Sequence, residues 1–328
     1  MGLLTGDYID WQLDPVMVFM WTCAWAVAHV VMYRLVIMPL ADRCFVAPTA
    51  LHQATAIAAN SAKEVNKQDG KDARLKQRKN TAKQADSDPI QSTDDQTKHA
   101  AAVKTMASMK KKFAKAAWKC FVYSVSTLIG LYVLFSDTWW MHPALWMLDY
   151  PDPTSVEMKL YYMIGFGNYM YQTLSLRTSE TDFAAMVVHH SSTIAVITAS
   201  YIFGFTRVGI IILLLHDCSD PIMEYAKCSL YLKKQQRADS FFTLFAVVFI
   251  VTRNILFPYV IRCAHVHSIL EDGTRMPRGS EFWGNFCLGC LWVLAALNFY
   301  WGFLIVKIAV KTAITGEVEG DIREQDDD

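Results

Sequence analysis

Long apolar runs separated by short polar stretches make up most of this chain. A helix that crosses a lipid bilayer needs about 20 mostly apolar residues, and seven segments of the chain reach roughly that length. They cover residues 15–38, 116–135, 157–176, 183–203, 207–232, 241–261 and 282–307. The pattern predicts an all-α, polytopic membrane protein with about seven transmembrane helices.

Two of the predicted helices are less uniform than the others. The third segment is diluted by two glycines and by Asn168 and Gln172, which indicates a helix packed within a bundle or lining a cavity. The fifth segment contains the dipeptide Asp220-Pro221. Because proline removes a backbone hydrogen bond, we expect the fifth helix to kink or restart there.

Polar stretches divide the chain into four parts. Residues 1–40 hold the first predicted transmembrane helix, and residues 112–311 hold the others. Residues 41–111, between them, are rich in Lys, Gln and Asp and carry too little apolar surface to fold alone. We therefore expect a polar cytosolic loop over 41–111 that is disordered or loosely helical, and an acidic cytosolic tail over 312–328.

Basic residues beside the predicted helices indicate the orientation of the chain. Lys and Arg gather after the first helix, before the second, between the fifth and sixth, and after the seventh. Because cytosolic loops carry the excess of Lys and Arg, the N-terminus is predicted to lie outside the cytosol and the C-terminus inside it. Arg275 and Arg278 fall on the opposite side.

The composition agrees with a membrane protein and bears on which classes of partner are expected. Hydrophobic residues make up 53% of the chain and charged residues 19%, with a formal net charge of zero. We expect membrane lipid as a partner and no nucleic acid. Cys287 and Cys290 form a CxxC motif inside an apolar run, without a second such pair, so we expect no metal site there.

The fourth and fifth predicted helices carry an unusual set of ionisable residues. The set consists of His189, His190, His216, Asp217, Asp220 and Glu224. A charged side chain at the centre of a bilayer costs about 2.5–3.5 kcal/mol. Such a concentration in two consecutive helices therefore indicates a functional site.

The histidines and carboxylates are expected to meet at one depth. At about 1.5 Å per residue, His189 and His190 lie about 10 Å from the cytosolic end of their helix. Asp217 and Asp220 lie about 10–15 Å from the cytosolic end of the next helix. On a continuous helix, Asp217, Asp220 and Glu224 would also lie near one face.

Two histidines beside carboxylates suit acyl transfer. One imidazole acts as nucleophile or base, while a carboxylate fixes the tautomer of the other and stabilises its cation. We favour His189 as the nucleophile that carries an acyl-imidazole intermediate and His190 as the base. The alternative is direct attack in a ternary complex, with both histidines acting as bases.

Other chemistries stay open. The same residue types bind metal ions in oxidising enzymes, but adjacent helical side chains diverge by about 100° and cannot easily chelate one ion together. We therefore expect no metal. A serine nucleophile at Ser191 or Ser192 would lack a supporting turn.

The spaced residues of this region resemble the longevity-assurance motif of ceramide synthases, which belong to the TRAM–Lag–CLN8 (TLC) family of membrane proteins. The matching residues are His189-His190-x-x-Thr193, Ser200-Tyr201, Arg207-x-Gly209, Leu215-His216-Asp217-x-x-Asp220 and Glu224-x-x-Lys227. The likeness extends upstream to KKFAKAAWKCFVYS, which contains Trp118. Downstream it includes RNILFPYVI, which contains Arg253, and LNFYWGFLIVK. It covers about residues 112–311, the expected TLC domain.

This resemblance implies a fold and a reaction. The implied fold is a ring of six helices around a membrane cavity, preceded here by one extra helix. The implied reaction is N-acylation of a sphingoid base such as sphinganine, with fatty acyl-CoA as co-substrate and no other cofactor. The implied location is the endoplasmic reticulum membrane, with a lumenal N-terminus. A non-catalytic TLC-domain protein that binds or senses lipid is the alternative, and homo- or hetero-oligomers are compatible with the sequence.

The resemblance also assigns site residues. The expected catalytic residues are His189, His190, Asp217 and Asp220. The expected substrate-binding or supporting residues are Thr193, Ser200, Tyr201, Arg207, His216, Glu224, Lys227, Trp118 and Arg253. Glu224 and Lys227 are one turn apart, and we expect between them only an exposed ion pair, worth a few tenths of a kcal/mol.

Overall fold

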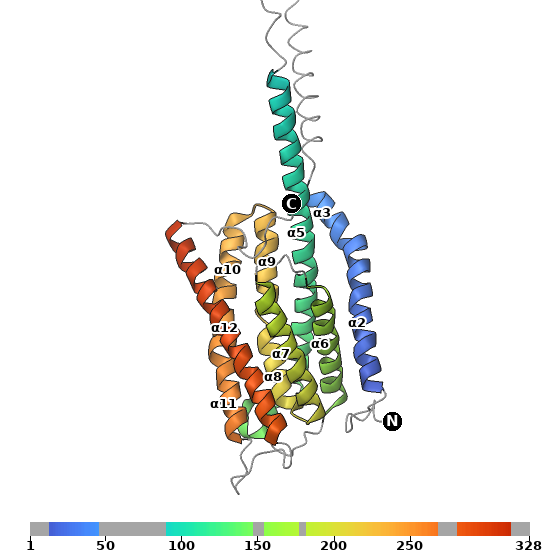
Figure 1. The fold of residues 1–328 in the computed structure, drawn as a ribbon, viewed down its shortest axis with the longest axis vertical. Helices are drawn as coiled ribbons and strands as arrows, with labels where there is room; N and C mark the ends of the chain where they lie inside the picture. The colour runs from blue at the N-terminus through green and yellow to red at the C-terminus, as the bar shows by residue number, and fades with distance from the viewer. Residues whose placement is uncertain (1–12, 46–89, 147–153, 177–181, 268–280, 316–328) are drawn as a thin grey trace, which may run out of the picture.

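The computed structural model describes residues 13–45, 90–146, 154–176, 182–267 and 281–315. Within these residues every regular element is a helix (Figure 1). The prediction of an all-α fold is therefore confirmed for the part of the chain that the structure describes.

Within the described ranges, five helical bodies are long and apolar enough to cross a membrane. The first joins α2 (Leu13–Met32), the π-helical turn η1 (Tyr33–Ile37) and α3 (Met38–Cys44). The others are α5 (Ile90–Phe135), α7 (Phe183–Ile202), the run of α10 (Gln235–Phe249), η4 (Ile250–Leu256) and α11 (Phe257–His267), and α12 (Glu281–Thr315). They correspond to five of the seven predicted spans.

The remaining two predicted spans form shorter helices. α6 (Val156–Leu174) is the segment diluted by glycine and amide residues. The fifth predicted helix is split into α8 (Thr206–Asp217) and α9 (Asp220–Tyr231), with Pro221 in the first turn of α9. The predicted break is thus confirmed, but Asp217 and Asp220 do not share one continuous helix as the spacing argument assumed. The total of seven spans stays a prediction.

The helices pack side by side in a cyclic order. Contacts run from α5 to α9, α10, α12, α7 and α6, and then back to α5. α8 contacts α5, α6, α7, η4 and α11, so it lies inside this cycle, while α2 packs outside it against α6. Figure 1 shows α5 extending beyond the bundle at the end where α3 lies, which we call the α3 end.

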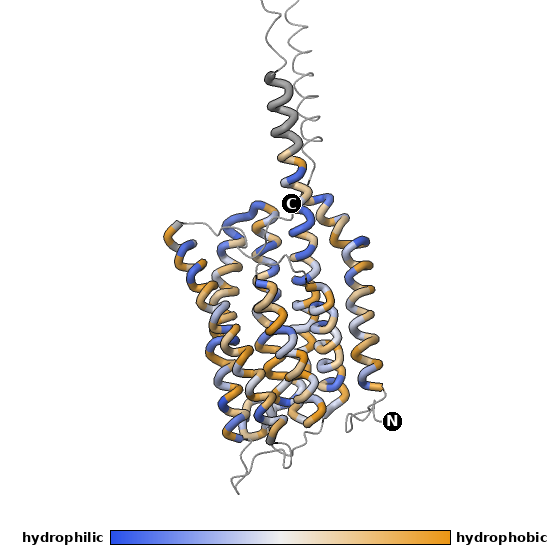
Figure 2. The backbone as a smooth tube through the Cα atoms, viewed as in Figure 1, coloured by the Kyte–Doolittle hydropathy of each residue, from blue (hydrophilic) through white to orange (hydrophobic). Residues whose placement is uncertain are grey.

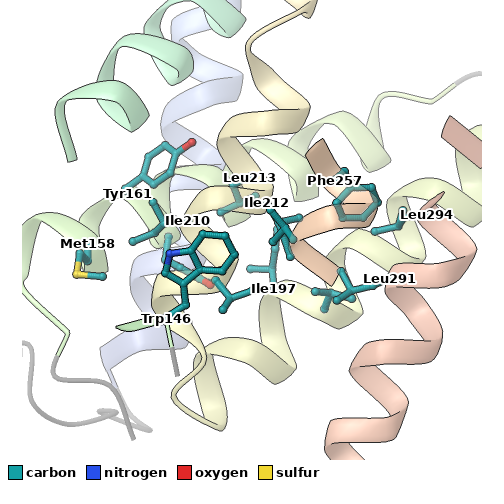
Figure 3. Packing of buried hydrophobic residues seen from close by; sticks show 14 of the residues in the cluster. Trp146, Met158, Tyr161, Ile197, Ile210, Ile212, Leu213, Phe257, Leu291 and Leu294 are labelled. Atoms are coloured by element: carbon teal, nitrogen blue, oxygen red, sulfur yellow. The ribbon is translucent and has the colours of Figure 1, made fainter. Parts of the chain in front are cut away.

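A large apolar core surrounds α8 (Figure 3). Ile210 and Ile212 of α8 are packed with Ile197, Phe257 and Leu294 from the neighbouring helices. Lipid is as apolar as these side chains, so close packing rather than escape from water stabilises such a core in a bilayer.

Gly209 of α8 is required by a close approach to α6. A Cβ atom at this position would lie 1.4 Å from the hydroxyl oxygen of Tyr162. That hydroxyl donates to the carbonyl of Thr206 at 3.3 Å. The glycine of the Arg207-x-Gly209 motif therefore allows α6 and α8 to pack closely.

Hydrophobic residues recur along the length of the bundle (Figure 2). Large side chains such as Phe19 and Leu35 on the first helix and Phe303 on α12 are about 70% exposed. Hydrophilic residues gather at the α3 end, as Figure 2 shows. An apolar belt with polar ends is what a lipid bilayer requires.

The predicted loop differs from the structure at both ends. Residues 41–111 were expected to be a polar loop, yet α3 reaches Cys44 and α5 begins at Ile90. The Lys-rich start of α5 is continuous with its apolar part, and one helix needs no boundary where its composition changes. Residues 46–89 lie outside the described residues. α12 ends at Thr315, so most of the acidic tail, residues 316–328, also lies outside them.

Candidate active site

The two adjacent histidines of α7 are both buried inside the bundle. His189 is 7% exposed and His190 is 2% exposed. Their ring centroids are 5.6 Å apart, with an angle of 83° between the ring planes. The two imidazoles therefore present different faces to different neighbours.

His189 has a buried nitrogen that is not used for hydrogen bonding. Among the described residues, its Nδ1 atom has no hydrogen-bond partner. Its ring lies 5.3 Å from the ring of Trp301 and 6.2 Å from that of His216, measured between centroids. A buried imidazole nitrogen without a partner is chemically available to a substrate.

His190 is held in one tautomer by Thr173 of α6. The Thr173 hydroxyl donates its only proton to the carbonyl of Tyr169 at 2.7 Å. Its oxygen lies 3.1 Å from His190 Nδ1, so it accepts a hydrogen bond from Nδ1–H. The lone pair of neutral His190 is then on Nε2, the nitrogen that accepts a proton in base catalysis.

His216 uses both ring nitrogens within the fold. Its Nδ1–H donates to the carbonyl of Ile212 at 2.8 Å. Its Nε2 is 3.0 Å from the amide nitrogen of Asn298, which donates to it. Because both nitrogens are occupied, His216 is suited to shaping the site rather than to transferring protons.

The two aspartates lie on either side of the break between α8 and α9. Asp217 is 4% exposed and accepts a hydrogen bond of 2.5 Å from the hydroxyl of Ser126 on α5. Asp220 forms an ion pair of 2.6 Å with Arg253 on the π-helical turn η4. These contacts join Asp217 to α5 and Asp220 to η4.

Arg253 also closes the end of α8. Its guanidinium donates to the carbonyl of His216. The last carbonyls of a helix have no partner within that helix, and the break at Cys218 and Ser219 leaves this carbonyl buried. Arg253 therefore links the helix break, Asp220 and the backbone of His216.

Glu224 differs from the expectation of an exposed ion pair. Its carboxylate lies 3.6 Å from the ammonium of Lys227, but its side chain is only 2% exposed. Extensive packing between α5 and α9 explains why Glu224 is covered. The ion pair is therefore buried on its acidic side.

Of three further predicted residues on α7, Thr193 stays beside the paired histidines, whereas Ser200 and Tyr201 have partners elsewhere. Thr193 donates to the carbonyl of His189 and stays close, at 2.8 Å. Ser200 follows His189 by about 16 Å along the helix axis, and it contacts Tyr162 at 3.3 Å. Its neighbour Tyr201 donates to Asp14 on α2 at 2.9 Å.

Arg207 and Trp118 also have structural partners elsewhere. Arg207 donates to the carbonyl of Leu145 at 2.7 Å. Trp118 stacks on His29 of α2, with ring centroids 4.8 Å apart. Both residues tie neighbouring segments together at a distance from the paired histidines.

Sequence reasoning did not single out four residues that contact the site. They are Ser126, Thr173, Asn298 and Trp301. Asn298 and Trp301 belong to the stretch LNFYWGFLIVK, which is part of the resemblance to the TLC family but was assigned no site residue. A polar amide in the middle of an apolar helix is a usable signal, because such residues are expensive in a membrane.

A small cavity lies between α6, α7, α8 and α12, and its lining includes His216 but neither of the paired histidines. Its walls are mostly apolar and include Ile197, Leu213 and Leu294, with Thr193 and His216 among the polar contributors. In the part of the chain that the structure describes, no three His, Cys, Asp or Glu side chains are grouped so as to hold one metal ion.

The fold and the site together define a class, a helical membrane protein with a buried cluster of histidines and aspartates. The chain belongs to the TLC-domain family (TRAM_LAG1_CLN8), whose domain matches residues 112–307.

Relatives of known name support this assignment. Ceramide synthase 4 of Mus musculus is 32% identical over 219 residues, which cover 66% of this chain and 54% of that protein. Ceramide synthase LOH1 of Arabidopsis thaliana is 32% identical over 233 residues, covering 66% of this chain and 75% of the relative. Alternaria stem canker resistance protein 1 of Solanum lycopersicum is 36% identical over 236 residues, with the same coverage. The chain thus spans about half the length of the mouse relative.

Proposed function

We propose that this protein is a sphingoid base N-acyltransferase, a ceramide synthase, which transfers a fatty acyl group from acyl-CoA to the amine of a base such as sphinganine. The observation that carries the proposal is the pair of buried imidazoles at His189 and His190, with different hydrogen bonding, in a chain related to ceramide synthases. A pocket that only binds lipid has no need of such a pair. The non-catalytic alternative is therefore not favoured.

The first step of the proposed reaction acylates His189. A nitrogen of the imidazole attacks the thioester carbonyl carbon, the carbon–sulfur bond breaks, and CoA leaves as a thiolate that takes up the proton lost from the other ring nitrogen of His189. The unpartnered, buried Nδ1 supports this role. A covalent intermediate lets CoA leave before the second lipid substrate reacts.

The second step transfers the acyl group to the amine. The amine nitrogen attacks the acyl carbon, the bond to His189 breaks, and an amide forms. The proton that the amine loses goes to Nε2 of His190, whose Nδ1–H is held by Thr173, and a proton returns to the His189 ring as its bond to the acyl group breaks. General bases of this kind contribute about 10²–10⁴-fold to a rate.

The carboxylates are proposed to support the histidines. Asp217, buried beside Ser126, adds a negative charge that stabilises an imidazolium. Asp220 holds Arg253, which in turn holds the carbonyl of His216. Among the residues assigned by resemblance, Asp217 is proposed to act electrostatically and Asp220 through position.

The environment suits two substrates with long tails. The apolar cavity beside His216 is proposed to receive part of a hydrocarbon chain. Lys and Arg near the α3 end favour a cytosolic position for that end, where the polyanionic CoA is also found. We propose the endoplasmic reticulum membrane, with the N-terminus lumenal and the C-terminus cytosolic.

The test is an assay of N-acylation in membranes that contain the protein. Sphinganine and a panel of acyl-CoAs are supplied, and the products are identified by mass spectrometry. The proposal expects dihydroceramides that are absent from matched membranes carrying the His189→Ala variant. Bound lipid with no amide formed from any acyl-CoA would instead support the non-catalytic alternative.

A further inference from the structure

α12 brings two polar side chains close to the histidines. The mechanism above gives neither of these side chains a role. Asn298 is fully buried, and Trp301 follows it by about one turn with 7% exposure. The Trp301 ring meets the His189 ring edge to face, with centroids 5.3 Å apart and planes at 74°. Asn298 donates to His216, whose ring is 6.2 Å from that of His189.

Three buried polar atoms in this group have no hydrogen-bond partner among the described residues. They are His189 Nδ1, Trp301 Nε1 and Asn298 Oδ1. The great majority of buried polar groups in proteins are paired. Unpaired atoms on three side chains of this one group therefore point to a polar ligand group that contacts it.

We propose that Trp301 Nε1–H donates a hydrogen bond to the acyl oxygen while the acyl group is carried to and from His189. This inference rests on the proposed function. When a nucleophile attacks the acyl carbon, the carbonyl oxygen becomes an oxyanion, which a positioned donor stabilises. The indole nitrogen is a donor only and has no competing acceptor role.

The distances suit this role. A carbonyl carbon bonded to an imidazole nitrogen places its oxygen about 3 Å from the centre of the ring, from standard bond lengths. The indole ring centre is 5.3 Å from that of His189, and an N–H donor sits about 2.7–3.2 Å from its acceptor oxygen. The acyl oxygen on His189 is therefore within reach of the edge of Trp301.

Arg253 is another donor in this region. Its Nε atom is also buried without a partner among the described residues. However, its guanidinium is held by Asp220 and by the carbonyl of His216, and it lies over Phe249 at 4.9 Å. Trp301 is favoured because its ring contacts the ring of His189.

The test compares Trp301→Phe with Trp292→Phe. Trp292 is on the same helix but is 52% exposed, so it supplies a matched control for the change of side chain. The proposal expects kcat of Trp301→Phe to fall by about 10²–10³-fold, as for loss of one oxyanion donor. KM for sphinganine and acyl-CoA and the thermal midpoint should stay close to those of the control.

Both half-reactions pass through an oxyanion, so both should be slowed. CoA release measured without amine, and discharge of the acylated protein by sphinganine, should each fall in Trp301→Phe. Where this variant does not accumulate, β-(3-benzothienyl)alanine introduced at position 301 keeps the ring shape and removes only the N–H. Rates within tenfold of the control in either variant would overturn the role of Trp301.

Loss of the proposed function and loss of the oxyanion donor would give different results. An inactive wild-type protein, tested with the full panel of acyl-CoAs, would remove the proposed function and this inference with it. An active wild type together with an equally active Trp301→Phe variant would remove only the oxyanion donor.

Discussion

At the scale of single residues, adjacent side chains in this site have distinct hydrogen-bonding states. His190 has its tautomer set by Thr173, His216 has both nitrogens engaged, and His189 keeps a buried nitrogen without a partner in the described chain. Three identical side chains, two of them adjacent in the sequence, thus have different chemistry. The difference comes from neighbours on α6, α8 and α12.

The division of roles between His189 and His190 leads to a first prediction. Both His189→Ala and His190→Ala should lose N-acylation by at least about 100-fold, because each removes a group that takes part in bond formation or proton transfer. Only His190→Ala should still form an acyl adduct with acyl-CoA in the absence of amine. Intact-mass analysis measures this adduct.

His142→Ala serves as the control for that experiment, since His142 is exposed and lies outside the site. It should keep full activity. An adduct that forms on His189→Ala, and not on His190→Ala, would reverse the two roles.

The second prediction concerns the buried carboxylates. Asp217→Asn should lower kcat by about 100-fold or more, because a buried charge that stabilises the imidazolium is lost. Glu224→Gln should lower the thermal midpoint, since it leaves Lys227 beside a buried neutral side chain. Its kcat should fall much less than that of Asp217→Asn. The two readouts are N-acylation rates and the thermal midpoint in detergent. Equal losses of kcat in both variants would contradict this assignment.

At the scale of elements, the break between α8 and α9 organises the site. It ends α8 at Asp217, starts α9 at Asp220, and leaves the carbonyl of His216 for Arg253 to bind. Arg253 reaches both partners from η4, a π-helical turn, a form of helix found often at functional sites. The break between α8 and α9 thus lies against the π-helical turn η4, and Arg253 joins the two.

The third prediction follows from these contacts. Arg253→Lys should lower activity by at least about tenfold, because Lys cannot reproduce the geometry that serves both Asp220 and the His216 carbonyl. Pro221→Ala should have a much smaller effect, since the first turn of a helix needs no hydrogen bond from this position. Activity and thermal midpoints of the two variants are compared side by side. A Pro221→Ala variant as impaired as Arg253→Lys would show that the proline, and not the arginine, maintains the break.

At the scale of the whole molecule, the first helix is joined to the cyclic bundle by polar contacts as well as apolar ones. Asp14 at the start of α2 forms an ion pair of 2.8 Å with Lys159 of α6, and both side chains are almost fully buried. Tyr201 of α7 donates to the same carboxylate. Near the other end of α2, His29 stacks on Trp118 of α5 and contacts Tyr171 of α6.

The fourth prediction tests the ion pair. Asp14→Asn should destabilise the protein by about 3–5 kcal/mol, because it leaves the Lys159 ammonium buried without its charge partner. The double variant Asp14→Leu with Lys159→Met should regain most of that loss, since apolar replacement of both partners is often neutral or stabilising. Thermal unfolding in detergent measures both. A double variant less stable than Asp14→Asn would indicate that the charges are needed for more than their mutual pairing.

The sequence by itself determined the helical class, the approximate position of most membrane helices and the break at Asp220-Pro221, and it predicted a site at the histidine pair. It did so because apolar length, proline chemistry and the cost of ionisable groups in lipid are local properties of the chain. It did not show that α5 begins as early as Ile90, since a helix continues across a change in composition. It also misjudged Glu224, whose burial depends on α5.

Only the tertiary structure decided which nitrogen of each histidine is engaged, and that Trp301 and Asn298 contact the site. It also decided that Trp118, Tyr201 and Arg207 bind elsewhere. These outcomes depend on how α6, α7, α8 and α12 pack against one another. Residues more than a hundred positions apart, such as His189 and Trp301, meet only through that packing, which periodicity along the chain does not encode.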